Sequence, residues 1–187
     1  MIVGRDEQVD GHYVGTRLAA LVVPAGSQYV GEKTQLAIKT SFGELALGFA
    51  RVWIPLAAVA WPVIFQLQPH AWVEAGVLAV VAVLLHRPRE LDDDDKKKLR
   101  VLGSQTGLRI DPARLRAETR RGKLEMLEAL MTKGGLAADP EWLVSVLDEI
   151  PVPALPLVYA YARYASDEPP WSDCAARVLE YIEANDL

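Results

Sequence analysis

The sequence has few of the residues that enzymes and metal proteins most often use for chemistry. Its 187 residues include three histidines (His12, His70 and His86) and one cysteine, Cys174. The three histidines and the cysteine lie far apart in the sequence, so we expect no zinc site. A single cysteine excludes an intramolecular disulfide and is typical of a reducing cytoplasm. We expect Cys174 to pack inertly within a helix.

Recognisable catalytic motifs are missing as well. The chain has no glycine-rich phosphate loop, no Gly-x-Ser-x-Gly elbow and no kinase or protease signature. We therefore predict no enzyme, and we assign no catalytic residue, metal ligand or cofactor. Residues 87–187 contain 15 Lys and Arg against 19 Asp and Glu. This mild acidity argues against nucleic acid as a partner, because nucleic acid needs a basic face.

Apolar residues are abundant between positions 45 and 85. The first run, 45–65, has 21 residues and one charge, Arg51; the second, 71–85, has 15 residues and one charge, Glu74. Neither run shows a polar face at helical spacing, and a bilayer core of ~30 Å needs ~20 helical residues. We predict a two-helix transmembrane hairpin over 45–86, with the uncharged stretch 66–70 as its turn. The alternatives are a buried hairpin in a soluble helical protein and a shallow re-entrant hairpin.

The charges around this segment predict its orientation. Arg51, Arg87 and Arg89 flank the open end, whereas the turn has no Lys or Arg. By the positive-inside rule, both termini should be cytoplasmic and the protein should lie in the inner membrane. No cleavable signal peptide is visible, so the hairpin itself would be the targeting signal.

Three residues of the segment are candidates for a membrane path or a helix interface: Arg51, Glu74 and Gly76. We expect Arg51 near one interface, where its side chain can reach the headgroups. Glu74 lies within four residues of the turn. It would sit at the other interface or, alternatively, line a path between subunits. Gly76, beside alanines at 71, 75 and 79, would permit close helix contact.

The N-terminal segment, 1–44, suggests short extended pieces at 17–23, 28–30 and 34–40, separated by Pro and Gly turns. We expect a short β-hairpin or docking arm. A rival interpretation rests on residues 22–31, which resemble a Pro-Gly…Gln-x-Tyr-x-Gly turn of small bacterial multi-helix membrane proteins, with Ala25 where a glycine is usual. This resemblance implies that 13–23 enters the membrane and that a helix begins at Thr34.

After a charged linker at 87–98, residues 99–187 read as a cytoplasmic all-helical domain of four to five short helices. Asp111-Pro112 and Asp139-Pro140 are helix starts, and Gly134-Gly135 is a helix end. The run of four aspartates before three lysines is a helix start rather than a cation site. Arg120, Arg121 and Lys123 form a small basic patch, which is a solvated face or an anion or headgroup contact.

The sequence as a whole predicts a mainly α, bacterial membrane protein that works by protein–protein interaction. Its partners would be the lipid bilayer and a protein or a second copy of itself. We expect a membrane-anchored, non-enzymatic component whose helical domain binds a partner or assembles a complex. One alternative is an oligomeric channel or membrane-disrupting effector, and another is a soluble helical protein with a buried hairpin.

Overall fold

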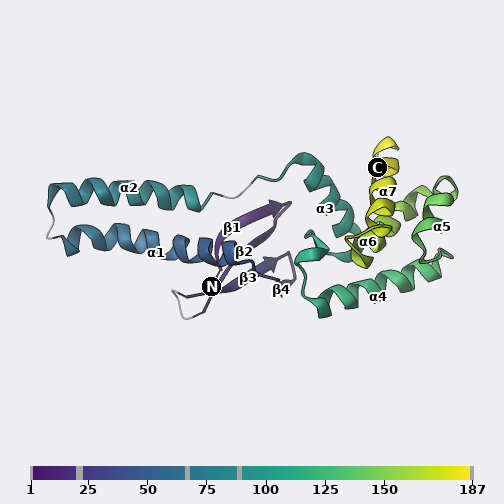
Figure 1. Cartoon of the computed structure of the whole chain (residues 1–187), viewed down its shortest axis with the longest axis horizontal. Helices are drawn as coiled ribbons and strands as arrows, with labels where there is room; N and C mark the ends of the chain where they lie inside the picture. Colours follow the sequence, from purple (N-terminus) through teal and green to yellow (C-terminus); the bar gives the residue numbers. More distant parts are fainter. Residues whose placement is uncertain (1, 20–22, 66–67, 88–89, 186–187) are drawn as a thin grey trace. The chain divides into compact units, whose positions relative to one another are not determined.

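The computed structural model describes residues 2–19, 23–65, 68–87 and 90–185, without the side chains of residues 3 and 5. The chain divides into two compact units, residues 1–91 and 92–187 (Figure 1). The first unit contains a sheet and two long helices, and the second contains helices and short 3-10 turns. Each unit is described by itself.

The first unit begins with an antiparallel sheet of four strands in the order β1-β2-β3-β4. The strands are β1 (Ile2–Val9), β2 (His12–Ala19), β3 (Val23–Val30) and β4 (Gln35–Ala37). Asp10 and Gly11 join β1 to β2 with φ of 44° and 83°, and Val9 pairs with His12 across this turn. Two positive φ angles give the type I′ turn that matches the twist of a two-residue hairpin.

Two helices follow the sheet, α1 (Phe42–Ile64) and α2 (Pro69–Leu85), and they pack along each other. A capping box starts α1, in which Ser41 accepts from the Glu44 backbone and Glu44 accepts from the Ser41 backbone. Gly48 lets α1 approach the sheet, because a Cβ at this position would lie 2.7 Å from Thr16 Cγ2. The first half of α1 therefore packs on the sheet.

The predicted two-helix transmembrane hairpin is wrong. Among the described residues one helix, α1, is long and apolar enough to cross a membrane. At ~1.5 Å per residue the 17 residues of α2 extend ~26 Å, which is less than the ~30 Å core of a bilayer. A single such helix is weak evidence, so the classification as a transmembrane protein is not supported by the fold.

The mainly α fold class and the all-α description are also wrong, because a four-stranded sheet makes this a mixed α and β fold. The N-terminal segment contains all four strands of this sheet rather than a short hairpin. The rival interpretation fails too: residues 13–19 belong to β2, which pairs with strands on both sides, and the residues after Thr34 form β4. Arg89 and Gln66, to which we gave roles in orientation and in the turn, lie outside the described residues.

The second unit consists of α3 (Asp93–Thr106), α4 (Ala117–Lys133), α5 (Pro140–Ser145), α6 (Leu155–Ala165) and α7 (Trp171–Ala184). Three 3-10 turns connect them: η1 (Pro112–Arg114), η2 (Leu147–Glu149) and η3 (Val152–Ala154). Helix α6 is central, since it contacts α3, α4 and α7. The core gathers side chains from every helix: Leu102, Leu127, Met131, Leu143, Leu155, Val158, Tyr164, Val178 and Ile182.

Local signals explain most helix boundaries of this unit. Asp139 accepts from the Trp142 backbone at 2.7 Å and starts α5, and α4 ends at Gly134, as predicted. Asp111 caps only the 3-10 turn η1, and α4 begins at Ala117, so the predicted single helix from Pro112 is interrupted. The last helix, α7, begins at Trp171, and Pro170 occupies its N-cap position.

Candidate functional site

The most unusual surface of the molecule is the outside of the α1–α2 pair. Val59 and Val73 are 77% and 70% exposed, and only 17% of the most apolar window of α1 is buried. Large apolar side chains that face outward are Trp53, Leu56, Val63, Ile64, Trp72, Val77, Val80, Val83 and Leu84. Contiguous exposed apolar surface of this kind is rare on soluble monomers and marks an interaction surface. We call these residues the apolar hairpin surface.

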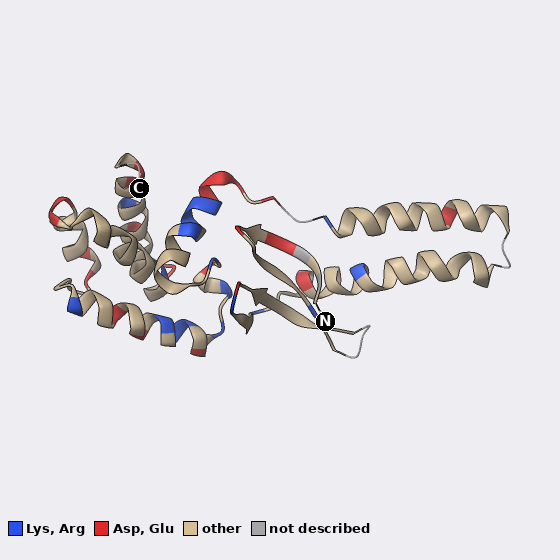
Figure 2. Ribbon diagram, turned by 180° about the vertical axis from the view of Figure 1, so that it is seen from behind, with Lys and Arg blue, Asp and Glu red and all other residues tan. Residues whose placement is uncertain are grey.

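Charge is almost absent from this surface. Figure 2 shows α1 and α2 mostly in tan. Glu44 lies in the first turn of α1, and Arg51 and Glu74 are the two charged residues of the described stretches 45–65 and 68–85. The two helices meet through small side chains, Ala71, Ala75 and Ala82, which are buried. Gly76 is exposed and a Cβ there would meet nothing within 4 Å, so Gly76 takes no part in the contact between α1 and α2.

Arg51 lies where the sheet meets the two helices. Its guanidinium forms an ion pair with Asp6 of β1, and its Nε donates to the Leu85 carbonyl at the end of α2 at 2.7 Å. Arg51 is 4% exposed. Its side chain is therefore buried, whereas we predicted that it would reach outward to the headgroups. A Cβ on Gly4 would lie 2.6 Å from the Arg51 Nη1, so glycine makes room for the guanidinium. Because Asp6 matches its charge, Arg51 ties β1, α1 and α2 together.

Glu74 lies near the other end of the pair. Its carboxylate accepts a hydrogen bond from the Trp61 indole at 2.5 Å, and the Trp61 ring packs on Phe65 with centroids 4.8 Å apart. The bond joins α2 to α1 within one chain. The structure therefore gives Glu74 an intramolecular partner, and the predictions of an interfacial site and of a path between subunits both stay untested.

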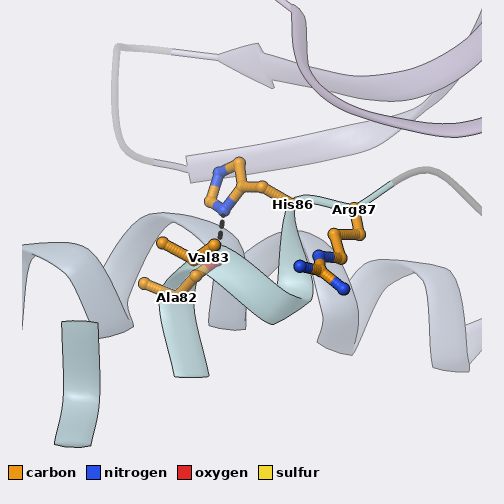
Figure 3. A pocket seen from close by; sticks show the side chains of 4 residues that line it. All are labelled: Ala82, Val83, His86 and Arg87. Atoms are coloured by element: carbon orange, nitrogen blue, oxygen red, sulfur yellow. Dashed lines mark hydrogen bonds between the residues drawn. The ribbon is translucent and has the colours of Figure 1, made fainter. Parts of the chain in front are cut away.

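The last backbone carbonyls of α2 all accept hydrogen bonds. The last four carbonyls of a helix normally lack intrahelical partners. Here the His86 backbone N–H reaches Ala82 and Val83, the Arg87 N–H reaches Leu84, and Arg51 reaches Leu85. The His86 ring adds a bond from Nδ1 to the Ala82 carbonyl at 2.8 Å. An open depression of about 380 Å³ lies beside this turn, lined by Ala82, Val83, His86 and Arg87 (Figure 3).

The predicted basic patch on α4 is divided among internal contacts. Arg120 donates to the Tyr164 carbonyl at 2.9 Å and pairs with Asp167 at 3.1 Å. Lys123 donates to the Thr106 carbonyl at the end of α3. Arg121 pairs with Glu125 one turn along α4. The contacts of Arg120 and Lys123 reach beyond α4, whereas that of Arg121 stays within it, and binding of an anion or headgroup by the three residues stays a prediction.

The acidic start of α3 and the lone cysteine both have local structural roles. Asp92 caps α3, where Lys96 pairs with Asp93, and this contact lowers the pKa of Asp93. Burial raises the pKa of the Cys174 thiol to about 11, which keeps it protonated at neutral pH. Within the described ranges, no group of three or more His, Cys, Asp or Glu is placed to hold a metal ion.

Sequence reasoning missed three residues of this region: Gly4, Asp6 and Trp61. Asp6 is 45 positions from Arg51. A pattern within a few neighbouring residues therefore cannot predict this ion pair. A usable signal did exist for its strand, because Asp10-Gly11 is a strong hairpin turn and would have predicted β1. Comparison with family models, curated proteins and solved structures found no match. The geometry of this chain is therefore the basis for the function proposed below.

Proposed function

We propose that this chain is a non-enzymatic attachment component: α1, with α2 packed along it, enters the apolar part of a lipid bilayer, and the helical unit binds a protein partner there. One observation carries the proposal. The apolar hairpin surface faces outward on both helices, although an apolar helix needs an apolar environment on every side. Crossing by α2 is not part of the proposal.

The shape of this surface favours lipid over a protein groove. A groove covers one side of a helix, as in recognition of amphipathic helices. Here the α2 residues Trp72, Val77 and Val83 are exposed on the side away from α1, and Trp53, Leu56 and Val59 are exposed on α1. A fluid apolar phase can surround such a pair without a complementary partner for each face.

The location in the cell follows as part of the same proposal. Both termini would lie on the cytoplasmic side of the inner membrane. The lone Cys174, buried and protonated, is compatible with a reducing compartment. The proposal does not include the oligomeric channel, because the Glu74 carboxylate already accepts a hydrogen bond from Trp61 of the same chain.

Cell fractionation tests attachment. The wild-type chain should pellet with membranes, resist a carbonate wash and need detergent for extraction. Val80→Asp places a charge on the apolar hairpin surface and should move the chain to the soluble fraction or to aggregates, because a charge in hydrocarbon costs about 3 kcal/mol. Val152→Asp, at an exposed position of the helical unit, is the matched control and should still pellet.

Light scattering of the detergent extract tests the rest of the proposal. A monomer or dimer with a co-purifying protein bound to residues 92–187 supports the attachment component. A large ring of the chain alone would favour the channel instead. Recovery of a monodisperse wild-type chain without detergent would refute lipid attachment.

A further inference from the structure

The depression at the end of α2 combines two surfaces of opposite character. Ala82 and Val83 form an apolar wall that continues the apolar hairpin surface. His86 and Arg87 line the other part. Figure 3 shows the His86 ring over Ala82 and Val83, with the Arg87 side chain extending away from that ring. The depression therefore lies where apolar side chains give way to cationic and polar ones.

Arg87 is available to a ligand. Its side chain is exposed, and over the described part of the chain it has no ion pair or hydrogen bond. The carbonyls around it do not need it, since backbone N–H groups and Arg51 already satisfy Ala82, Val83, Leu84 and Leu85. Arg51 itself is neutralised by Asp6. Arg87 is thus the first uncompensated cation after the apolar run.

His86 is oriented by its own helix. A carbonyl can only accept, so the bond from Nδ1 to the Ala82 oxygen places a proton on Nδ1. The other ring nitrogen, Nε2, remains for a second polar partner. The depression accordingly presents a guanidinium and one imidazole nitrogen beside an apolar wall.

We propose that this depression binds an anionic phospholipid, with the phosphate on Arg87 and the first acyl segment against Ala82 and Val83. A guanidinium matches phosphate oxygens with two parallel hydrogen bonds, and an apolar wall does nothing for a free inorganic anion. The inference rests on the proposed function, because a bilayer would bring headgroups to the level at which α2 ends. It adds the class of lipid.

The test uses the full-length chain and two kinds of vesicle: phosphatidylcholine alone, and phosphatidylcholine mixed with phosphatidylglycerol. The wild type should bind the anionic vesicles more tightly. Arg87→Gln should lower this binding about fivefold, the effect of one cation near an anionic surface, and should lower binding to phosphatidylcholine less, because the choline cation neutralises that phosphate. Arg87→Lys should recover only part of the loss, because an ammonium keeps the charge but does not form the two parallel hydrogen bonds of a guanidinium.

Arg177→Gln is the charge-matched control, because it removes one exposed cation from α7. An equal loss for Arg177→Gln would show a net-charge effect and overturn the site. Competition by inorganic phosphate would overturn a lipid ligand in favour of a soluble anion. Equal binding of wild type to both vesicles would overturn the inference and leave the attachment intact, whereas no binding to either would overturn the proposed function as well.

Discussion

The helical unit and the α1–α2 pair place their large apolar side chains in opposite ways. In the helical unit Leu127, Met131 and Leu143 are fully buried against neighbouring helices of the same unit. In the α1–α2 pair valines and tryptophans face outward, and alanines fill the contact between the helices. The first arrangement supplies its own apolar environment, while the second requires one from outside. The presence of apolar side chains in a helix therefore does not show whether other parts of the same chain cover them.

The two regions also differ in how they use charge. Arg120 and Arg163 of the helical unit pair with Asp167 and Asp111 at partly exposed positions, where an ion pair contributes little. Arg51 is buried with Asp6, where the loss of either partner leaves an unmatched charge. One buried ion pair therefore contributes strongly to the attachment of α1 to the sheet, whereas each of these ion pairs in the helical unit contributes little.

The largest expected effect comes from breaking the buried ion pair. Asp6→Leu leaves the Arg51 guanidinium buried without its carboxylate and should lower the free energy of unfolding of the first unit by about 3–5 kcal/mol. The double variant Asp6→Leu with Arg51→Met should recover most of this loss, because it removes both charges. Denaturant unfolding in mild detergent measures both. A double variant as unstable as the single one would contradict the argument.

A core substitution sharpens the contrast between the regions. Leu127→Ala should destabilise the helical unit by about 2–5 kcal/mol, since the side chain is fully buried. Val77→Ala, at a position 60% exposed on α2, should change the stability of the protein in detergent by less than about 0.5 kcal/mol. Hydrogen exchange resolved to each unit reports both. A large effect of Val77→Ala would mean that the hairpin is covered within its own chain.

Helix caps should behave alike in both regions, because a cap is local. Ser41→Ala removes the capping box of α1 and Asp139→Ala removes the cap of α5. Each should cost about 1 kcal/mol of unfolding free energy. Exchange of the first-turn amides measures the effect. A loss at Ser41 several times larger than at Asp139 would show that its partner Glu44, which also accepts from Ser27, couples the cap to the sheet.

The smallest effect is a pH dependence of the helical unit. Burial raises the pKa of Cys174 from 9.0 to about 11, so the folded state holds its proton after the unfolded state has lost it. Stability should therefore fall as pH rises from about 9 towards 11, by roughly 0.8 kcal/mol at pH ~9.5. Cys174→Ala should flatten this part of the profile. An unchanged slope would assign the alkaline loss to other groups, such as Tyr159, whose pKa burial raises to about 12.

Signals that act over a few residues could be read from the sequence. Asp139-Pro140 marks the start of α5 and Gly134 the end of α4, because caps involve only adjacent backbone. The aspartate run was identified as a helix start, and Asp92 caps α3. Asp10-Gly11 is a turn signal that indicates the first hairpin. We did not predict its first strand, β1, because the sequence of β1 contains several charged residues.

Features that depend on distant contacts could not be read in this way. An arginine near the start of an apolar run looks like an interfacial residue, and only the pairing of β1 shows that Asp6 covers it. The same applies to Trp61 and Glu74, 13 positions apart, whose bond depends on how α2 folds back along α1. The apolar segment could be identified from the sequence. The lengths of its two helices and its attachment to a sheet could be seen only in the structure.

One unbroken helix, α1, runs from the sheet into the apolar pair. From Gly48, which touches the sheet, to Ile64 it extends ~24 Å at ~1.5 Å per residue. Because Arg51 is held near this contact by Asp6 and Leu85, the first turns of α1 are fixed to the strands while the rest of the helix extends away from them. A tilt of the outer end should then be passed on to the sheet through this contact. A spectroscopic label on β2 or β3 would consequently report the inclination of the hairpin without touching its apolar surface.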